Sequence, residues 1–142
     1  ILVLIFAMLM IGVGMQRTGA IDLVARWVAP YLASTSPLVT LIIVYLLTST
    51  LTEMITNNAV AVVMTPIVIG LASQIGVDPR PLVVAVMFAA SASFATPIGY
   101  QTNTLVYGAG NYKFADFLKI GIPMNIIVGV STCIAIYFYY GM

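Results

Sequence analysis

The sequence predicts an all-α polytopic membrane protein in which transmembrane helices accompany a re-entrant helical hairpin and a discontinuous helix. Hydrophobic residues make up 62% of the 142 residues, whereas charged residues make up only 6%. A soluble domain carries about 25% charged residues, so this chain has too few charges to cover a water-facing surface. Polar but nearly uncharged segments interrupt the apolar runs at residues 52–59 and 96–103, which full transmembrane spans alone do not explain.

The composition also excludes several kinds of chemistry. The chain contains no His, which removes His-based catalysis and most zinc sites. Its one cysteine, Cys133, lies in an apolar run and predicts neither a disulfide framework nor a metal cluster. The net charge is +1 and no basic cluster is present, so nothing indicates a nucleic-acid partner. Without a convincing Ser–Lys pair or paired carboxylates, we expect no enzymatic activity.

The N-terminal part of the chain is predicted to contain the end of one helix, followed by a second helix in the membrane interface. Ile1 opens a hydrophobic run without a basic n-region or a cleavage site, so we expect a fragment of a longer protein rather than a signal peptide. Residues 1–15 are expected to end a transmembrane helix. Residues 17–30 combine helically spaced apolar residues with an Asp22–Arg26 pair, which predicts an amphipathic helix in the membrane interface. This helix could act as a lever that links a moving domain to a fixed one, or it could be a connecting helix with no special role.

Residues 38–74 are predicted to form the re-entrant hairpin. Its uninterrupted apolar arms hold roughly 15 residues each, or about 22 Å of helix, against a bilayer core of about 30 Å. The segment between them, residues 52–59, has no Gly and a single charge, Glu53. These features favour a hairpin that enters and leaves the membrane on the same side over two helices that each cross the membrane. Glu53 could be functional, or it could pair with Arg17 or Arg80 at an aqueous edge.

Residues 82–110 are predicted to form the discontinuous helix. An apolar run stops at Ala95, and the polar, uncharged residues 96–103 follow, with Pro97 to break a helix and Gly99 to permit unusual dihedral angles. Irregular backbone at membrane depth is tolerated only where it is buried or lines a cavity. Beyond it, we expect an interfacial segment at residues 111–119 and a full transmembrane helix at residues 120–140.

The two interruptions place helix ends inside the membrane. A helix carboxyl end carries partial negative charge and can hold a cation, whereas an amino end can hold an anion. We expect Asn57 or Asn58 to cap the second hairpin arm. Thr52 and Thr56, one helical turn apart, should share a face and offer oxygen ligands to a small cation such as Na⁺.

The pattern Thr52-x-x-x-Thr56-Asn57-Asn58, followed by Ala95-Thr96-Pro97, resembles the divalent anion/sodium symporter family. The resemblance spans essentially the whole chain and corresponds to the C-terminal half of such proteins, one half of an inverted repeat. It implies a secondary active permease that moves sulfate, a dicarboxylate or a tricarboxylate such as citrate, coupled to Na⁺ or H⁺, by alternating access. The family's tip reads Ser-Asn-Thr, so this chain departs from it at the first and third positions.

The resemblance also implies binding roles. Na⁺, the one expected cofactor-like ion, would be held by Thr52, Thr56, Asn57 and the backbone carbonyl of Ala95. The anionic substrate would contact Asn57, Asn58, Thr96 and Pro97. The implied partners are this small anion, the lipid bilayer, the missing N-terminal half and a second copy in a homodimer, in a prokaryotic inner membrane and without nucleic acid.

Two other hypotheses about the function stay open at this point. One is an arsenite-type permease or a Na⁺/H⁺ antiporter of the same superfamily. Antiporters usually need intramembrane acidic residues, and Glu53 is the one available here. A non-transporting membrane anchor domain is the other alternative, although an anchor has no need of the two polar interruptions.

Overall fold

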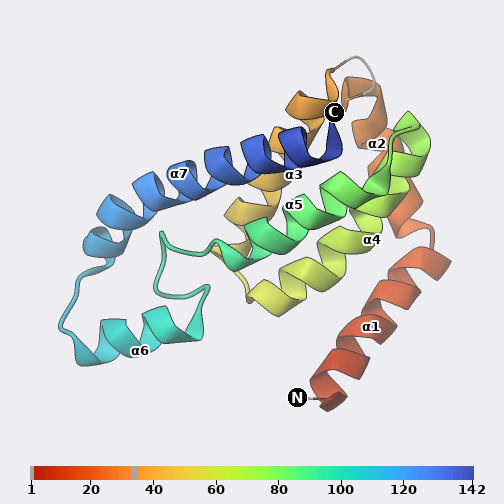
Figure 1. The fold of residues 1–142 in the computed structure, drawn as a ribbon. Helices are drawn as coiled ribbons and strands as arrows, with labels where there is room; N and C mark the ends of the chain where they lie inside the picture. The colour runs from red at the N-terminus through yellow and green to blue at the C-terminus, as the bar shows by residue number, and fades with distance from the viewer. Residues whose placement is uncertain (1, 33–34) are drawn as a thin grey trace.

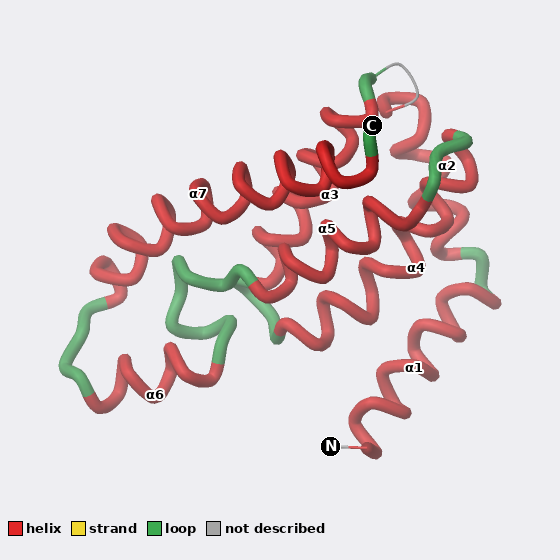
Figure 2. The backbone as a smooth tube through the Cα atoms, viewed as in Figure 1, coloured by secondary structure: helices red, strands yellow, loops and turns green. Residues whose placement is uncertain are grey.

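The computed structural model describes residues 2–32 and 35–142, and this part of the chain is helical, without a strand (Figure 1 and Figure 2). The predicted all-α class is therefore confirmed for these residues. Residues 53–56, named the tip here, join α3 to α4, and residues 92–100, the break, separate α5 from α6. The helices are α1 (Leu2–Arg17), α2 (Ala20–Leu32), α3 (Pro37–Thr52), α4 (Asn57–Ile75), α5 (Pro79–Ser91), α6 (Gln101–Ala109) and α7 (Phe114–Tyr140).

Local signals explain where the central helices begin and end. Pro37 occupies the first position of α3, and the Ser36 side chain accepts a hydrogen bond from the amide of Val39. Asp78 caps α5 in the same way, accepting from the amide of Arg80 at 3.0 Å. Helix α4 ends at Ile75, and its C-cap Gly76 has a φ of +73°, the left-handed conformation that glycine adopts without strain.

Helix α5 lies against both arms of the α3–α4 hairpin, and it packs on each arm more extensively than the arms pack on one another. Small buried residues on α5, Ala85, Ala89 and Ala90, permit this close approach. The chain therefore forms a three-helix core in which α3 and α5 run in the same direction and end side by side (Figure 1). The buried cluster comprises Leu41, Val44, Tyr45, Val60, Met64, Val68, Leu71, Ala72, Leu82, Ala85, Val86, Ala89, Ala90, Ala92, Cys133 and Ile136.

The outer helices differ in detail from the expected segments. Arg17 ends α1 rather than opening the amphipathic helix, and α2 continues through Pro30 to Leu32. Helix α7 begins at Phe114 and therefore includes most of the expected interfacial segment. Its start is capped by the Asp116 carboxylate, which accepts a hydrogen bond from the Lys113 amide at 2.8 Å. In Figure 1, α6 stands apart from the core, and none of its residues is buried.

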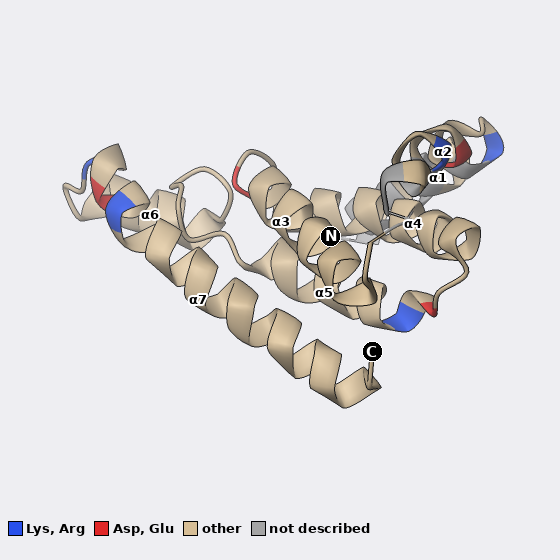
Figure 3. Ribbon diagram, turned by 90° about the horizontal axis from the view of Figure 1, so that it is seen from above, with Lys and Arg blue, Asp and Glu red and all other residues tan. Residues whose placement is uncertain are grey.

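Two of the described helices, Asn57–Ile75 and Phe114–Tyr140, are long and apolar enough to cross a membrane. Helix α3, with 16 residues, is shorter. Figure 3 shows that acidic and basic residues lie on α2 or near helix ends and connections, while the middles of α3, α4, α5 and α7 carry none. This distribution is typical of helices whose sides contact lipid tails.

Candidate functional site

The carboxyl ends of α3 and α5 meet at one place, which we call the junction: Ser49, residues 52–57, Ala90 and the break. Side chains of α3 satisfy the carbonyls that α5 leaves free at its end. The Thr52 hydroxyl donates to the Ala90 carbonyl at 2.8 Å, and the Ser49 hydroxyl donates to the Ala92 carbonyl at 3.4 Å. Thr52 is completely buried. Two helix carboxyl ends therefore direct partial negative charge to the same point.

Asn57 links the hairpin to the break, and it does not cap α4. The N-cap is Thr56, which makes no side-chain cap hydrogen bond, so the prediction that Asn57 or Asn58 caps the second arm is wrong. The Asn57 carboxamide lies 2.7 Å from the Thr52 hydroxyl. With its nitrogen turned toward these neighbours, it also reaches the carbonyls of Ala90 at 3.1 Å and Gly99 at 3.3 Å.

Thr52 and Thr56 do not share a helical face, contrary to expectation. Helix α3 ends at Thr52, and the amides of Met54 and Ile55 both donate to the Leu51 carbonyl, which closes a turn instead of continuing the helix. The two threonines consequently have different surroundings: Thr52 is buried and Thr56 is exposed. The spacing argument failed because it assumed one continuous helix through the tip.

Glu53, the tip's one charged residue, points into the break. Its carboxylate accepts hydrogen bonds from three consecutive backbone amides, from one hydroxyl and from one carboxamide on α7. Neither Arg17 nor Arg80 is among these partners, so the alternative of an ion pair with one of these arginines is not realised. The donors are the amides of Phe94 (3.0 Å), Ala95 (2.9 Å) and Thr96 (2.8 Å), Nδ2 of Asn125 (2.7 Å) and Oγ of Ser93 (3.4 Å).

The break returns hydrogen bonds to the end of α3. The Ser93 hydroxyl shares its single proton between the Thr52 carbonyl at 3.3 Å and the Glu53 carboxylate at 3.4 Å. The Thr96 hydroxyl donates to the Glu53 carbonyl at 2.7 Å. Gly99 makes this closeness possible, because a Cβ at that position would overlap Ser93 Oγ and the Thr52 carbonyl oxygen. The tip and the break are thus joined by hydrogen bonds in both directions.

Helix α6 holds the far side of the break. Asn103 donates through Nδ2 to the carbonyls of Ser93 at 2.9 Å and Thr96 at 3.1 Å, and the Thr104 hydroxyl donates to the Pro97 carbonyl. The helix resumes at Gln101, so the last three residues of the predicted polar interruption are already helical. The side chains of Asn103 and Thr104 order the break from within the resumed helix.

The junction unites part of the predicted binding set. Thr52, Asn57, Ala95 and Thr96 lie within one hydrogen-bonded cluster, and Pro97 is buried in the same loop. The side chains of Thr56 and Asn58 are exposed at the start of α4. Sequence reasoning missed other residues, although a lone carboxamide within an apolar span and hydroxyls at helix ends were available as signals. These residues are Ser49, Ser93 and Asn125. Gly99 was expected to supply an unusual dihedral angle, but its φ is not positive, and it is needed for close approach instead.

Comparison with known proteins assigns the chain to a family. A model of the family described as citrate transporter matches residues 1–142, the whole chain. The chain belongs to the citrate transporter family. Several relatives are named as sodium-coupled transporters of sulfate, dicarboxylates or citrate, in agreement with the resemblance to divalent anion/sodium symporters. This citrate transporter family chain is therefore part of an integral, multi-pass membrane protein, as predicted.

Three relatives illustrate the similarity. An uncharacterized transporter of Synechocystis is 38% identical over 146 residues, covering 100% of this chain and 23% of the relative. Sodium/sulfate cotransporter 1 of Chlamydomonas reinhardtii is 41% identical, covering 61% of this chain and 10% of its own length. The sodium-dependent dicarboxylate transporter SdcS of Staphylococcus saprophyticus is 27% identical, covering 97% of this chain and 26% of the relative. The chain thus spans about a quarter or less of each of these relatives.

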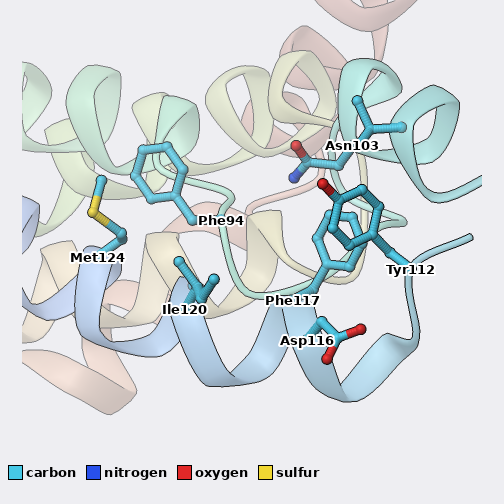
Figure 4. Close-up of a pocket in the computed structure, with 9 residues that line it drawn as sticks. Phe94, Asn103, Tyr112, Asp116, Phe117, Ile120 and Met124 are labelled. Carbon is cyan, nitrogen blue, oxygen red and sulfur yellow. The ribbon is translucent and has the colours of Figure 1, made fainter. Parts of the chain in front are cut away.

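A separate cavity of about 320 Å³ lies between the break, α6 and α7 of this citrate transporter family chain (Figure 4). Its lining is largely apolar, and its one charged group, the carboxylate of Asp116, would repel an anion. None of the four predicted substrate residues lines it. The cavity is therefore a poor fit for a divalent anion. Its lining residues are Phe94, Asn103, Val106, Tyr112, Asp116, Phe117, Ile120, Gly121 and Met124.

Replacing Thr52 should destabilise the junction. In Thr52→Ala the Ala90 carbonyl and the Asn57 carboxamide each lose a buried partner, which costs about 1–3 kcal/mol per unsatisfied group. We expect a lower midpoint of thermal unfolding for the full-length protein in detergent and sodium-free buffer. Thr50→Ala is the matched control, because the Thr50 hydroxyl is exposed and bonds only the Leu46 carbonyl of its own helix. Equal midpoints for the two variants would contradict the hydrogen bonding described here.

Proposed function

We propose that this chain forms part of a secondary active transporter that moves a divalent anion, such as sulfate or a di- or tricarboxylate, coupled to Na⁺ by alternating access. The supporting observation is the junction, where two helix carboxyl ends and the amino end of α4 come together beside irregular backbone. In transporters, interrupted helices of this kind provide sites for ions and anionic groups near the middle of the bilayer.

Thr52, Thr56, Asn57 and Ala95 are the proposed cation ligands. The buried oxygen atoms of this part of the junction favour a hard monovalent cation, since helix carboxyl ends carry partial negative charge. In support, Thr52 and Asn57 are in direct contact, and Glu53 binds the amide of Ala95 beside them. Thr56, which is exposed, would have to approach through its backbone or through movement of the tip.

Asn57, Asn58, Thr96 and Pro97 are the proposed substrate contacts. The amino end of α4 begins at Asn57, and its first amides have no partner within the helix, which suits an anion. The exposed Asn58 side chain adds a carboxamide donor at the same end. The amides of residues 94–96 are unavailable to the substrate, because Glu53 already occupies them.

The membrane arrangement is part of the same proposal. Helix α3, at about 24 Å for its 16 residues, is short for a bilayer core of about 30 Å. We place the α3–α4 hairpin as a re-entrant element that enters and leaves on one side, in one half of an inverted repeat, with the rest of the full-length protein supplying the other half. A second copy in a homodimer would complete the assembly.

Sodium-driven uptake tests the proposal. The full-length protein, reconstituted in liposomes, should accumulate labelled sulfate or succinate when an inward Na⁺ gradient is imposed, and an equal K⁺ gradient should not drive uptake. Liposomes without protein provide the background. Absence of uptake for every tested di- and tricarboxylate and for sulfate, with correctly inserted protein, would overturn the proposed function.

A further inference from the structure

We propose that Glu53 and Asn125 form a positioning pair that keeps the junction ready to bind the coupling cation, an inference that rests on the proposed function. The Glu53 carboxylate draws in the amides of three successive residues of the break, an arrangement that normally serves as a binding concavity for a free anion. Here the anion is supplied by the protein itself. The carboxylate therefore attaches the break to the end of α3.

The first consequence concerns geometry. Glu53 directly follows Thr52, the end of α3, and one of its oxygens binds the Ala95 amide at 2.9 Å. The same oxygen also accepts from Phe94, so the backbone of the break cannot rotate without losing charge-assisted hydrogen bonds. Ala95 is thereby held at a set distance from Thr52. Two proposed cation ligands from different helices are preorganised by one side chain.

The second consequence concerns charge. All five donors to the Glu53 carboxylate are neutral, so no positive side chain among its hydrogen-bond partners cancels its charge. A carboxylate inside an apolar helical assembly is costly and marks a functional position. The carboxyl ends of α3 and α5 add partial negative charge at the same place. A cation bound at the junction would relieve this excess.

Asn125 extends the arrangement to α7. Its Nδ2 donates to Glu53 at 2.7 Å, while its buried Oδ1 has no hydrogen-bond partner among the described residues. Gly121, one turn earlier on the same face, lets α7 approach, because a Cβ there would overlap the Phe94 carbonyl. Helix α7 therefore contacts the tip through Asn125 and the break at Gly121, and its position is linked to the state of the junction.

The test measures sodium binding separately from transport. Na⁺ should raise the unfolding temperature of the full-length wild-type protein in detergent relative to equal K⁺, since a ligand that binds the folded state stabilises it. We expect Glu53→Gln to shift the Na⁺ concentration for half-maximal stabilisation at least about tenfold upward. The amide nitrogen of Gln would also face donors, either Thr96 or the pair Phe94 and Ala95. Asn125→Ala, which keeps the Glu53 charge, should raise the Na⁺ concentration for half-maximal stabilisation about three- to fivefold.

Uptake measurements distinguish positioning from general damage. In liposomes the same variants should raise the Na⁺ concentration for half-maximal uptake, with the maximal rate at saturating Na⁺ preserved within about twofold. The double variant should shift less than the product of the single shifts, because both act through one hydrogen bond. Asp116→Asn, an exposed carboxylate at the start of α7, is the control and should leave both values unchanged.

The outcomes separate the two proposals. Loss of maximal rate with an unchanged Na⁺ requirement would overturn the positioning role and leave only a structural one. Absence of any Na⁺-specific stabilisation of the wild-type protein would overturn it as well. If no anion is taken up while the stabilisation shifts as expected, the proposed function fails and the positioning pair stands. Should Glu53→Gln not fold, Asn125→Ala decides the question.

Discussion

Gly99→Ala is expected to reduce substrate uptake strongly in the full-length protein while leaving membrane insertion intact. A Cβ at Gly99 would overlap Ser93 Oγ and the backbone carbonyl oxygen of Thr52, and backbone at the end of α3 cannot move aside without disturbing the hairpin. Overpacking of this kind costs about 1–3 kcal/mol or more. The break would be displaced from the tip, so we expect uptake to fall at least about tenfold. Labelled succinate or sulfate uptake in liposomes measures this.

Gly108→Ala is the matched control for Gly99. It lies nearby in α6, and a Cβ there would meet nothing within 4 Å. Alanine also has the higher helix propensity, so this variant should insert and transport as the wild type does. If both glycine variants transported normally, the close passage of the break over α3 would not be required for function.

Asn57→Ala is expected to reduce uptake to background. Asn57 joins both proposed binding sets, and its carboxamide bridges the Thr52 hydroxyl, the Ala90 carbonyl and the Gly99 carbonyl. Truncation leaves these groups short of partners in a partly buried place, at about 1–3 kcal/mol each. It also removes the group that links the amino end of α4 to the carboxyl end of α5. We expect loss of both Na⁺ response and uptake in liposomes.

Gln101→Ala provides a chemically matched comparison. Gln101 is also a carboxamide at the first position of a helix, but its side chain is exposed and lies outside the proposed sites. Uptake by this variant should remain within about twofold of wild type, as for most surface substitutions. If the Asn57→Ala variant took up substrate as fast as the wild type, Asn57 would not belong to the binding site, whatever the behaviour of Gln101→Ala.

The parts of the protein that depend on local properties could be predicted from the sequence. The apolar composition requires a membrane, and in lipid each segment must satisfy its own backbone, which makes helices obligatory. Polar residues and Pro97 within apolar runs indicate that the helices are interrupted, although α5 ends at Ser91, four residues before the predicted stop at Ala95. The convergence of Thr52, Asn57, Ala95 and Thr96 was anticipated from these interruptions together with the family resemblance.

Relationships between distant segments required the tertiary structure. Glu53 could have been paired with an arginine on the basis of charge, yet its partners are amides of residues 94–96, which acquire that role only when the break folds back over α3. Asn125 lies 72 residues further along the chain, and no local pattern relates the two. The N-cap at Thr56 likewise follows from the turn after α3, which the spacing of the threonines did not reveal.

The sequence by itself therefore determined the class of protein and the approximate segments that form helices, because hydrophobicity and helix breaking act over a few neighbouring residues. The tertiary structure decided which polar groups satisfy one another. That choice depends on how α3, α5 and α7 are brought together by packing of small residues such as Ala89, Gly99 and Gly121. Once the helices are that close, a carboxylate with no basic partner becomes the link between tip and break.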